Sequence, residues 1–217
     1  MPTSAPETML PRRTRRKETR PGELIEAALN LFIEKGFAAT KSEEVAQRAG
    51  VSKGTLFLYF ATKEDLFKAV VRENISSLFP SWNEEMESFA GSCSDMLAYA
   101  MTSWWERVGQ TKAGGIAKLV ISEAQNFPDI AAFYQQEVIT PGTLLLKKIL
   151  QRGVDRHEFR DLDLDQAVFT LVAPMIFLML WKNSMGACAS SAGEVMNPEQ
   201  FIALQVDVLL NGLKVKA

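Results

Sequence analysis

The stretch AGVSKGTLFLYFATKEDL, residues 49–66, restricts the fold more than any other part of the chain. It holds a glycine suited to a sharp turn with positive φ, Gly50, and two residues later a hydroxyl suited to begin a helix, Ser52. A second capping hydroxyl, Thr62, begins the next helix, so the helix between them covers little more than residues 53–60. The pattern predicts a helix-turn-helix with a short second helix that is offered to the major groove of DNA.

The rest of the chain has the periodicity of helices rather than strands. From Pro21 onward apolar residues recur every three or four positions, and no segment alternates convincingly with a period of two. Gly36 is expected to end the first helix, and Thr40 with Glu43 has the spacing of a capping box that begins the second. The sequence predicts an all-α protein of about nine helices, with an N-terminal three-helix helix-turn-helix domain and a larger helical domain.

The same pattern divides the chain into four segments. Residues 1–19, rich in Pro, Thr and Arg, are predicted to form a disordered basic arm. Residues 20–66 form the helix-turn-helix domain, residues 67–80 a connecting helix that a proline ends, and residues 81–217 the larger domain. The arm is either a solubilising tail or a contact with DNA phosphates or the minor groove, and both readings stay open.

Charge is distributed unevenly along the chain. The formal net charge is −2, but the first 72 residues hold 13 Lys and Arg against 9 Asp and Glu, whereas the remainder hold 11 against 17. A basic end on an acidic body is the asymmetry expected when that end meets a polyanion.

The helix-turn-helix region resembles a known family. The run GFAATKSEEVAQRAGVSKGTLFLYFATKEDL, residues 36–66, is similar to the DNA-binding signature of the TetR-family transcriptional regulators, and the resemblance covers about residues 20–70. Two positions depart from the family pattern: Phe57 stands where the family often has Tyr, and Ser42 where an apolar residue is common. The residues that carry the resemblance are Thr40, Ala46, Ala49, Gly50, Val51, Ser52, Gly54, Thr55, Tyr59, Phe60 and Lys63.

The resemblance implies roles for individual residues. Phosphate contacts are expected from Thr40, Lys41, Lys53, Tyr59 and Lys63, and base-edge contacts from Thr55, Leu56 and Phe57. Ser52 is expected to cap the reading helix, and Gly54 to let it approach the DNA closely. The implied partner is double-stranded operator DNA.

The larger domain is expected, by resemblance, to hold a cavity for a small-molecule effector. Large apolar side chains at helical spacing are more often plain core, but Pro174 interrupts the most apolar helix and can leave space beside it. Without paired charges on these helices, the effector is expected to be apolar or aromatic. The candidate effector residues are Met101, Trp104, Trp105, Phe127, Phe133, Phe177 and Trp181.

A homodimer is expected through the last two long helices. The segment Asp163–Met185 is apolar almost all round, which exceeds what one core face needs, and the final helix carries an apolar stripe. Two such helices per chain would form a four-helix interface. The alternative is a single thick core. The expected interface residues are Leu171, Met175, Leu178, Leu204 and Val208.

Other classes of function are disfavoured. The chain has one histidine, His157, and two distant cysteines, Cys93 and Cys188, which are expected to be free thiols, so no metal site, cofactor or catalytic relay is expected. The longest apolar run, residues 171–181, is short for a bilayer, and a cytoplasmic protein without membrane contact is expected.

The expected function is a DNA-binding regulator, most simply a repressor that an apolar effector releases from a palindromic operator. In the simplest switch, the connecting helix from Lys63 to Phe79 is the one direct link between the two domains. The alternatives are a regulator without a small-molecule effector and an all-helical interaction adaptor. A steep dependence of specific DNA binding on salt would exclude the adaptor.

Overall fold

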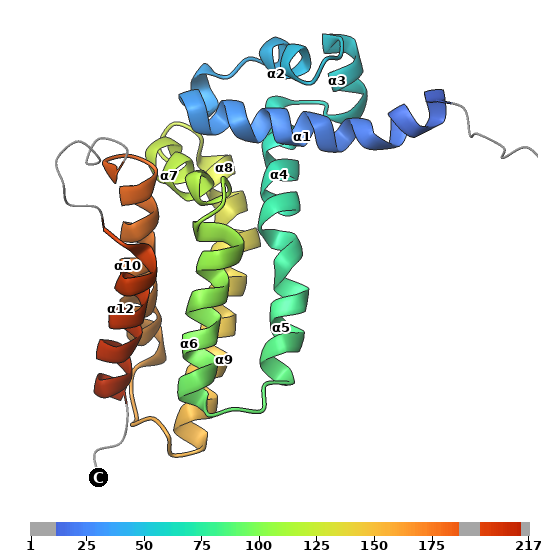
Figure 1. Ribbon diagram of the computed structural model, residues 1–217. Helices are drawn as coiled ribbons and strands as arrows, with labels where there is room; N and C mark the ends of the chain where they lie inside the picture. The colour runs from blue at the N-terminus through green and yellow to red at the C-terminus, as the bar shows by residue number, and fades with distance from the viewer. Residues whose placement is uncertain (1–11, 187–195, 214–217) are drawn as a thin grey trace, which may run out of the picture.

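The computed structural model describes residues 12–186 and 196–213, and these residues form helices and no strand. The predicted all-α fold is therefore confirmed. Three helices form a head that lies across one end of the molecule: α1 (Arg12–Ala39), α2 (Ser42–Arg48) and α3 (Lys53–Tyr59). Helix α4 (Lys63–Asn74) leads from this head to a larger helical body, as Figure 1 shows.

The body is a bundle of long helices that run away from the head. Helices α6 and α9 pack against each other in its centre, with α5 on one side and α10 and α12 on the other (Figure 1). Short helices α7 and α8 lie at the end next to the head. The elements are a 3-10 turn η1 (Ser76–Leu78), α5 (Phe79–Glu87), α6 (Cys93–Trp104), a π turn η2 (Trp105–Gly109), α7 (Gly114–Glu123), α8 (Pro128–Tyr134), a π turn η3 (Gln135–Ile139), α9 (Thr140–Asp155), α10 (Leu164–Lys182) and α12 (Pro198–Leu213).

Two boundaries differ from the prediction. Helix α1 begins at Arg12 rather than Pro21, so the part of the arm from Arg12 to Thr19 is helical and not disordered; its Arg, Lys and Glu residues are good helix formers. The rest of the predicted arm lies outside the described residues. Helix α4 ends at Asn74, because Ile75 leaves the helical region (φ −133°, ψ −58°), and Pro80 lies in the first turn of α5 instead of ending the connecting helix.

The head has its own aromatic core. The rings of Phe32, Phe37 and Phe67 are all buried and their centroids lie 5.4–5.8 Å apart, so α1 and α4 share one cluster. Ala46, on α2, is 1% exposed, and its small side chain lets α2 lie close to its neighbours. Gly50 has a φ of 67° and turns the chain from α2 towards α3, as predicted.

Candidate nucleic-acid interface

Local hydrogen bonds fix the start of α3. The Ser52 hydroxyl accepts a hydrogen bond from the Thr55 backbone N–H at 3.1 Å, so Ser52 is the predicted N-cap. The Val51 N–H donates to the Ala46 carbonyl at 2.9 Å and closes the turn after α2. Thr62 caps α4 in the same way, accepting from the Asp65 N–H at 3.0 Å. These bonds hold α3 as a seven-residue helix on the outside of the head.

The two faces of α3 differ in burial. Leu56 is 0% exposed and packs into the head, so the base-edge contact predicted for it is wrong. Phe57 and Leu58 are 41% and 84% exposed, whereas Thr55 and Tyr59 are half-buried. Leu58 was missed by the sequence analysis. The helical period could have found it, because a residue two positions from a buried one lies nearly opposite to it.

Thr40 does not face solvent. Its side chain is 1% exposed, and its hydroxyl donates to the Gly36 carbonyl at 2.7 Å, with the Leu31 carbonyl at 3.2 Å. The phosphate contact predicted for Thr40 is therefore wrong, because its one hydroxyl proton closes the C-terminal end of α1. The capping box lies one residue later than predicted: Lys41 is the N-cap of α2, and Glu44 accepts from its N–H at 3.1 Å.

Lys63 also caps α1 rather than pointing outward. The ring of Phe37 lies 4.3 Å below its ammonium group, and partial burial lowers the pKa of Lys63. All three ammonium protons have backbone acceptors, so the phosphate contact predicted for Lys63 is not supported. The acceptors are the carbonyl oxygens of Phe37 (2.8 Å), Thr40 (3.1 Å) and Ala38 (3.3 Å).

Of the lysines predicted to contact phosphate, Lys41 and Lys53 remain on the outside of the head. Both are exposed. The Lys53 ammonium forms an ion pair with Glu43, which lowers the pKa of that carboxyl, and lies 5.7 Å from the centroid of the Phe57 ring. The candidate interface is therefore a basic edge from Lys41 to Lys53 beside the apolar face of α3.

Gly54 is exposed in the first turn of α3. A Cβ built there would meet only the Ser52 hydroxyl oxygen, at 3.8 Å, so the head itself leaves room for a side chain. We therefore expect Gly54→Ala to raise the free energy of unfolding by up to about 1 kcal/mol, through helix propensity, but to weaken operator binding about tenfold by holding α3 off the DNA. Thermal melts and gel shifts measure the two effects. Equal operator affinity would show that α3 does not approach DNA closely at Gly54.

A second contact joins the head to the body, in addition to α4. The Ala38 N–H donates to the Glu123 carboxylate at 3.2 Å, and the rings of Phe37 and Phe127 meet edge to face at 4.8 Å. Lys112 donates to the Asn30 side chain at 2.8 Å. The view of α4 as the one direct link is therefore wrong, because the C-terminal half of α1 also rests on α7 and the loop that follows it (Figure 1).

The predicted effector residues do not surround one space. Met101 and Trp105 are buried in the core, and Phe127 packs on the head. Phe133 is half-buried beneath the cationic groups of Lys68 and Arg72, whose distances to its ring centroid are 5.8 Å and 5.0 Å.

The remaining three effector candidates are also dispersed. Trp104 is half-buried at the end of α6. Phe177 is 47% exposed, and its ring centroid lies 6.0 Å from that of Trp181 and 6.5 Å from that of Phe201, so this pair belongs to the face that α10 and α12 share.

Pro174 lies inside a continuous α10 and does not break it. In the turn before this proline, the Leu171 carbonyl accepts a hydrogen bond from the buried Gln205 side chain at 2.9 Å. Helix α12 therefore packs where the sequence analysis expected an empty space beside the kink.

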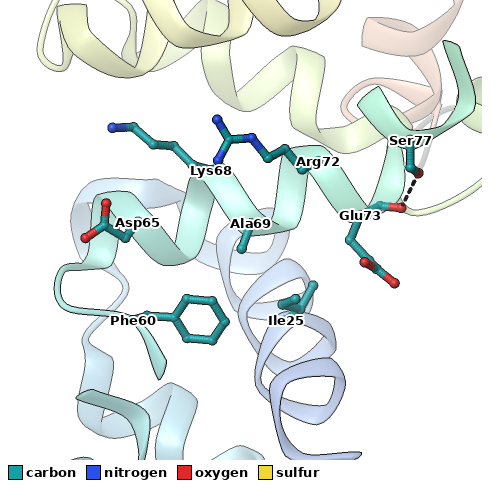
Figure 2. Close-up of a pocket in the computed structure, with 8 residues that line it drawn as sticks. All are labelled: Ile25, Phe60, Asp65, Lys68, Ala69, Arg72, Glu73 and Ser77. Atoms are coloured by element: carbon teal, nitrogen blue, oxygen red, sulfur yellow. Dashed lines mark hydrogen bonds between the residues drawn. The ribbon is translucent and has the colours of Figure 1, made fainter. Parts of the chain in front are cut away.

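Two hollows on the surface of the described part are lined by other residues than the predicted effector residues. One, of about 490 Å³, runs between α1 and α4, where Figure 2 shows Phe60 and Ile25 on one side of α4 and Lys68 and Arg72 on the other. The other, of about 480 Å³, lies beside α9 around Leu144 and has a mostly apolar lining. Both are open grooves.

The outer face of α10 and α12 is apolar. Phe169, Phe177, Leu204 and Val208 are all between 47% and 69% exposed. Leu204 and Val208 are exposed on this face, and their place in a dimer interface stays a prediction. The other three predicted interface residues are in the core, because α10 turns that side towards the bundle: Leu171 (2% exposed), Met175 (5%) and Leu178 (1%).

By length and composition, helix α10 is also long and apolar enough to cross a membrane. The sequence did not indicate this, because the apolar run at residues 171–181 is shorter than the helix. The core helix of a soluble protein passes the same test, and α10 packs on α7, α9 and α12 in the bundle.

Cys93 is a buried free thiol, as predicted, and burial raises its pKa; Cys188 lies outside the described residues. Within residues 12–186 and 196–213, no group of three His, Cys, Asp or Glu side chains is arranged to hold a metal ion.

A helix-turn-helix head with an exposed reading helix, joined to a larger helical body, defines the class of helix-turn-helix DNA-binding proteins. Residues 24–70 match the family model described as "Bacterial regulatory proteins, tetR family", and residues 90–186 match "Tetracyclin repressor-like, C-terminal domain". The chain therefore belongs to the TetR family of transcriptional regulators, which confirms the resemblance seen in the sequence.

Its relatives are regulators rather than enzymes. The HTH-type transcriptional repressor KstR2 of Mycobacterium tuberculosis is 28% identical over 149 residues, which cover 68% of this chain and 73% of that protein. KstR2 of Rhodococcus jostii is 29% identical over 153 residues, covering 70% and 74%. Among solved structures, the fatty acid degradation regulator FadR from Bacillus halodurans has a TM-score of 0.72 at 20% identity, covering 88% of this chain and 94% of that one.

Proposed function

We propose that this regulator is a cytoplasmic homodimeric repressor that binds a two-fold symmetric operator through α3 and is released by an apolar small molecule. The observation that carries the proposal is the exposed face of α3 beside Lys41 and Lys53, on a head that is otherwise well packed. A helix presented in this way fits the major groove, and lysines at its edge fit the phosphates on either side.

A dimer is consistent with a two-fold symmetric operator. One α3 contacts too few base pairs for specificity, so two heads must act together, about 34–36 Å or a multiple of that distance apart. The exposed apolar face of α10 and α12 offers a surface on which two copies can pair and thereby fix the spacing of the heads. If α10 crossed a membrane, the same face would have to contact lipid. A cytoplasmic dimer accounts for the exposed apolar face more simply.

The effector is proposed to act on the end of the body that touches the head. Phe127, in the loop before α8, meets Phe37 of α1, and Phe133 lies on α8, which meets α4, whereas Trp105 lies on η2, which meets α7. A molecule wedged among them would displace both contacts with the head and change the spacing of the two α3 helices. A relative named as a fatty acid metabolism regulator, and a solved structure of FadR from Bacillus subtilis in complex with stearoyl-CoA, make acyl chains and their thioesters the first compounds to test.

Reciprocal titration tests this switch. A compound found by thermal-shift screening is titrated with and without operator, following tryptophan fluorescence. We expect operator to weaken the compound about 5- to 150-fold, because an effector that releases DNA must be weakened by DNA to the same extent. Equal affinity in both titrations would indicate a regulator without a small-molecule switch. The dispersed positions of the effector candidates favour that alternative.

The Glu123 contact gives this test a matched pair of variants. Glu123→Ala removes the acceptor for the Ala38 N–H, whereas Glu123→Gln keeps an oxygen that can accept it. We expect the alanine variant to bind operator but to lose most of the effector response, and the glutamine variant to retain it. If both variants respond like the original protein, the α1–α7 contact does not transmit the signal.

A further inference from the structure

The outermost strip of α3 is apolar. An α-helix turns about 100° per residue, so Gly54 and Leu58 lie about 160° and 200° around α3 from the buried Leu56. Both therefore point directly away from the head. Leu58 is 84% exposed, more than any other large apolar side chain in the part of the chain that the structure describes.

This strip offers no hydrogen-bonding side chain. Gly54 has none, and Leu58 ends in methyl groups. The polar neighbours flank the strip and already have partners within the head: the Thr55 hydroxyl lies 2.9 Å from that of Ser52, and Lys53 is paired with Glu43. Phe57, 41% exposed, extends the apolar surface on the side of Lys53.

The chemistry of this strip restricts what it can recognise. Base edges in the major groove carry hydrogen-bond donors and acceptors, and among them only thymine presents an apolar group, its C5 methyl. Polar base edges placed against a leucine would lose water without gaining a hydrogen bond, which is unfavourable. A thymine methyl against the same leucine would bury apolar surface on both sides.

We propose that Leu58 reads thymine methyl groups, while Phe57 only extends the apolar surface beside it, so that the centre of each operator half-site is specified by apolar contact rather than by hydrogen bonds. The inference rests on the proposed function, because it requires α3 to enter the major groove. It assigns specificity to a residue that the family resemblance did not single out.

Deoxyuridine substitution is the direct test, because deoxyuridine differs from thymidine only by the missing methyl group. An operator is first selected from a random DNA pool, and its thymines are then replaced one at a time, in both half-sites together. We expect one or two positions at which the loss of two methyl groups lowers affinity about 5- to 15-fold, from roughly 0.8 kcal/mol for each methyl.

Comparing the thymine and deoxyuridine operators in two protein variants assigns the methyl dependence to Leu58. Leu58→Ala is expected to bind the thymine operator more weakly and to bind the thymine and deoxyuridine operators equally well. Its melting temperature should not change, because the side chain is exposed. Leu144→Ala, at a 55% exposed leucine on α9 in the body, is the matched control and should retain the methyl dependence.

Each outcome is decisive. Equal affinity for every deoxyuridine operator would overturn the proposal, and so would a methyl dependence that persists in Leu58→Ala, since another residue would then read the methyl. Failure to select any operator would instead overturn the proposed function.

Discussion

Leu204→Glu is expected to convert the protein from a dimer to a monomer. Leu204 is 64% exposed on the apolar face of α10 and α12, so a carboxylate there costs the folded monomer little but would be buried without a partner in the dimer. Light scattering at micromolar concentration measures the mass. Operator affinity should fall by about 10²- to 10⁴-fold, because the two heads would no longer bind as a linked pair.

Leu178→Glu is the matched control on the opposite side of α10. Leu178 is 1% exposed, so the same substitution there should unfold the body rather than dissociate a dimer. Circular dichroism separates the two results: the Leu204 variant keeps its helices and the Leu178 variant loses them. A Leu204 variant that remains dimeric would place the interface elsewhere.

Gly36→Ala is expected to have the second large effect. Gly36 has φ 86° and ψ 169°, a conformation that is almost restricted to glycine, and a Cβ there would lie 3.2 Å from the Glu123 carboxylate. We expect a loss of about 2–3 kcal/mol in the free energy of unfolding and a lower operator affinity, since this residue sets the path from α1 to α2. Urea denaturation and gel shifts measure both.

Gly22→Ala is the control for this substitution. Gly22 lies in the same helix, with no neighbouring atom within 4 Å of its added Cβ, and should gain up to about 1 kcal/mol. The double variant Gly36→Ala with Glu123→Ala removes the close contact but not the backbone strain, so it should remain destabilised. Unchanged stability of Gly36→Ala would mean that the turn is not strained.

The fold was predictable because its signals are local. Gly50 and the caps at Ser52 and Thr62 act within one turn of the chain, and all three are found where the sequence indicated. The roles of Thr40 and Lys63 were not predictable in this way. Both side chains serve the carbonyl groups at the end of α1: the Thr40 hydroxyl turns back to the Gly36 carbonyl, whereas the Lys63 ammonium meets the Phe37 carbonyl only when α4 has packed on α1.

The body was less predictable for a related reason. Helix α10 is apolar all round, so periodicity could not tell which side meets the core, and Leu178 and Phe177 could not be separated by pattern. The aromatic residues proposed for the effector were chosen by size, and size alone does not distinguish core, surface and cavity. In the structure, some of these aromatic residues lie in the core and others at the surface, and they do not line a shared cavity.

Selection of bound DNA from a random pool tests the central claim, that two copies of this chain read a symmetric operator through α3. We expect an enriched sequence with two inverted half-sites whose centres lie about 34–36 Å, or a multiple of this, apart, bound by two copies of the chain or a multiple of two. An enriched sequence without two-fold symmetry, or no enrichment at all, would contradict it.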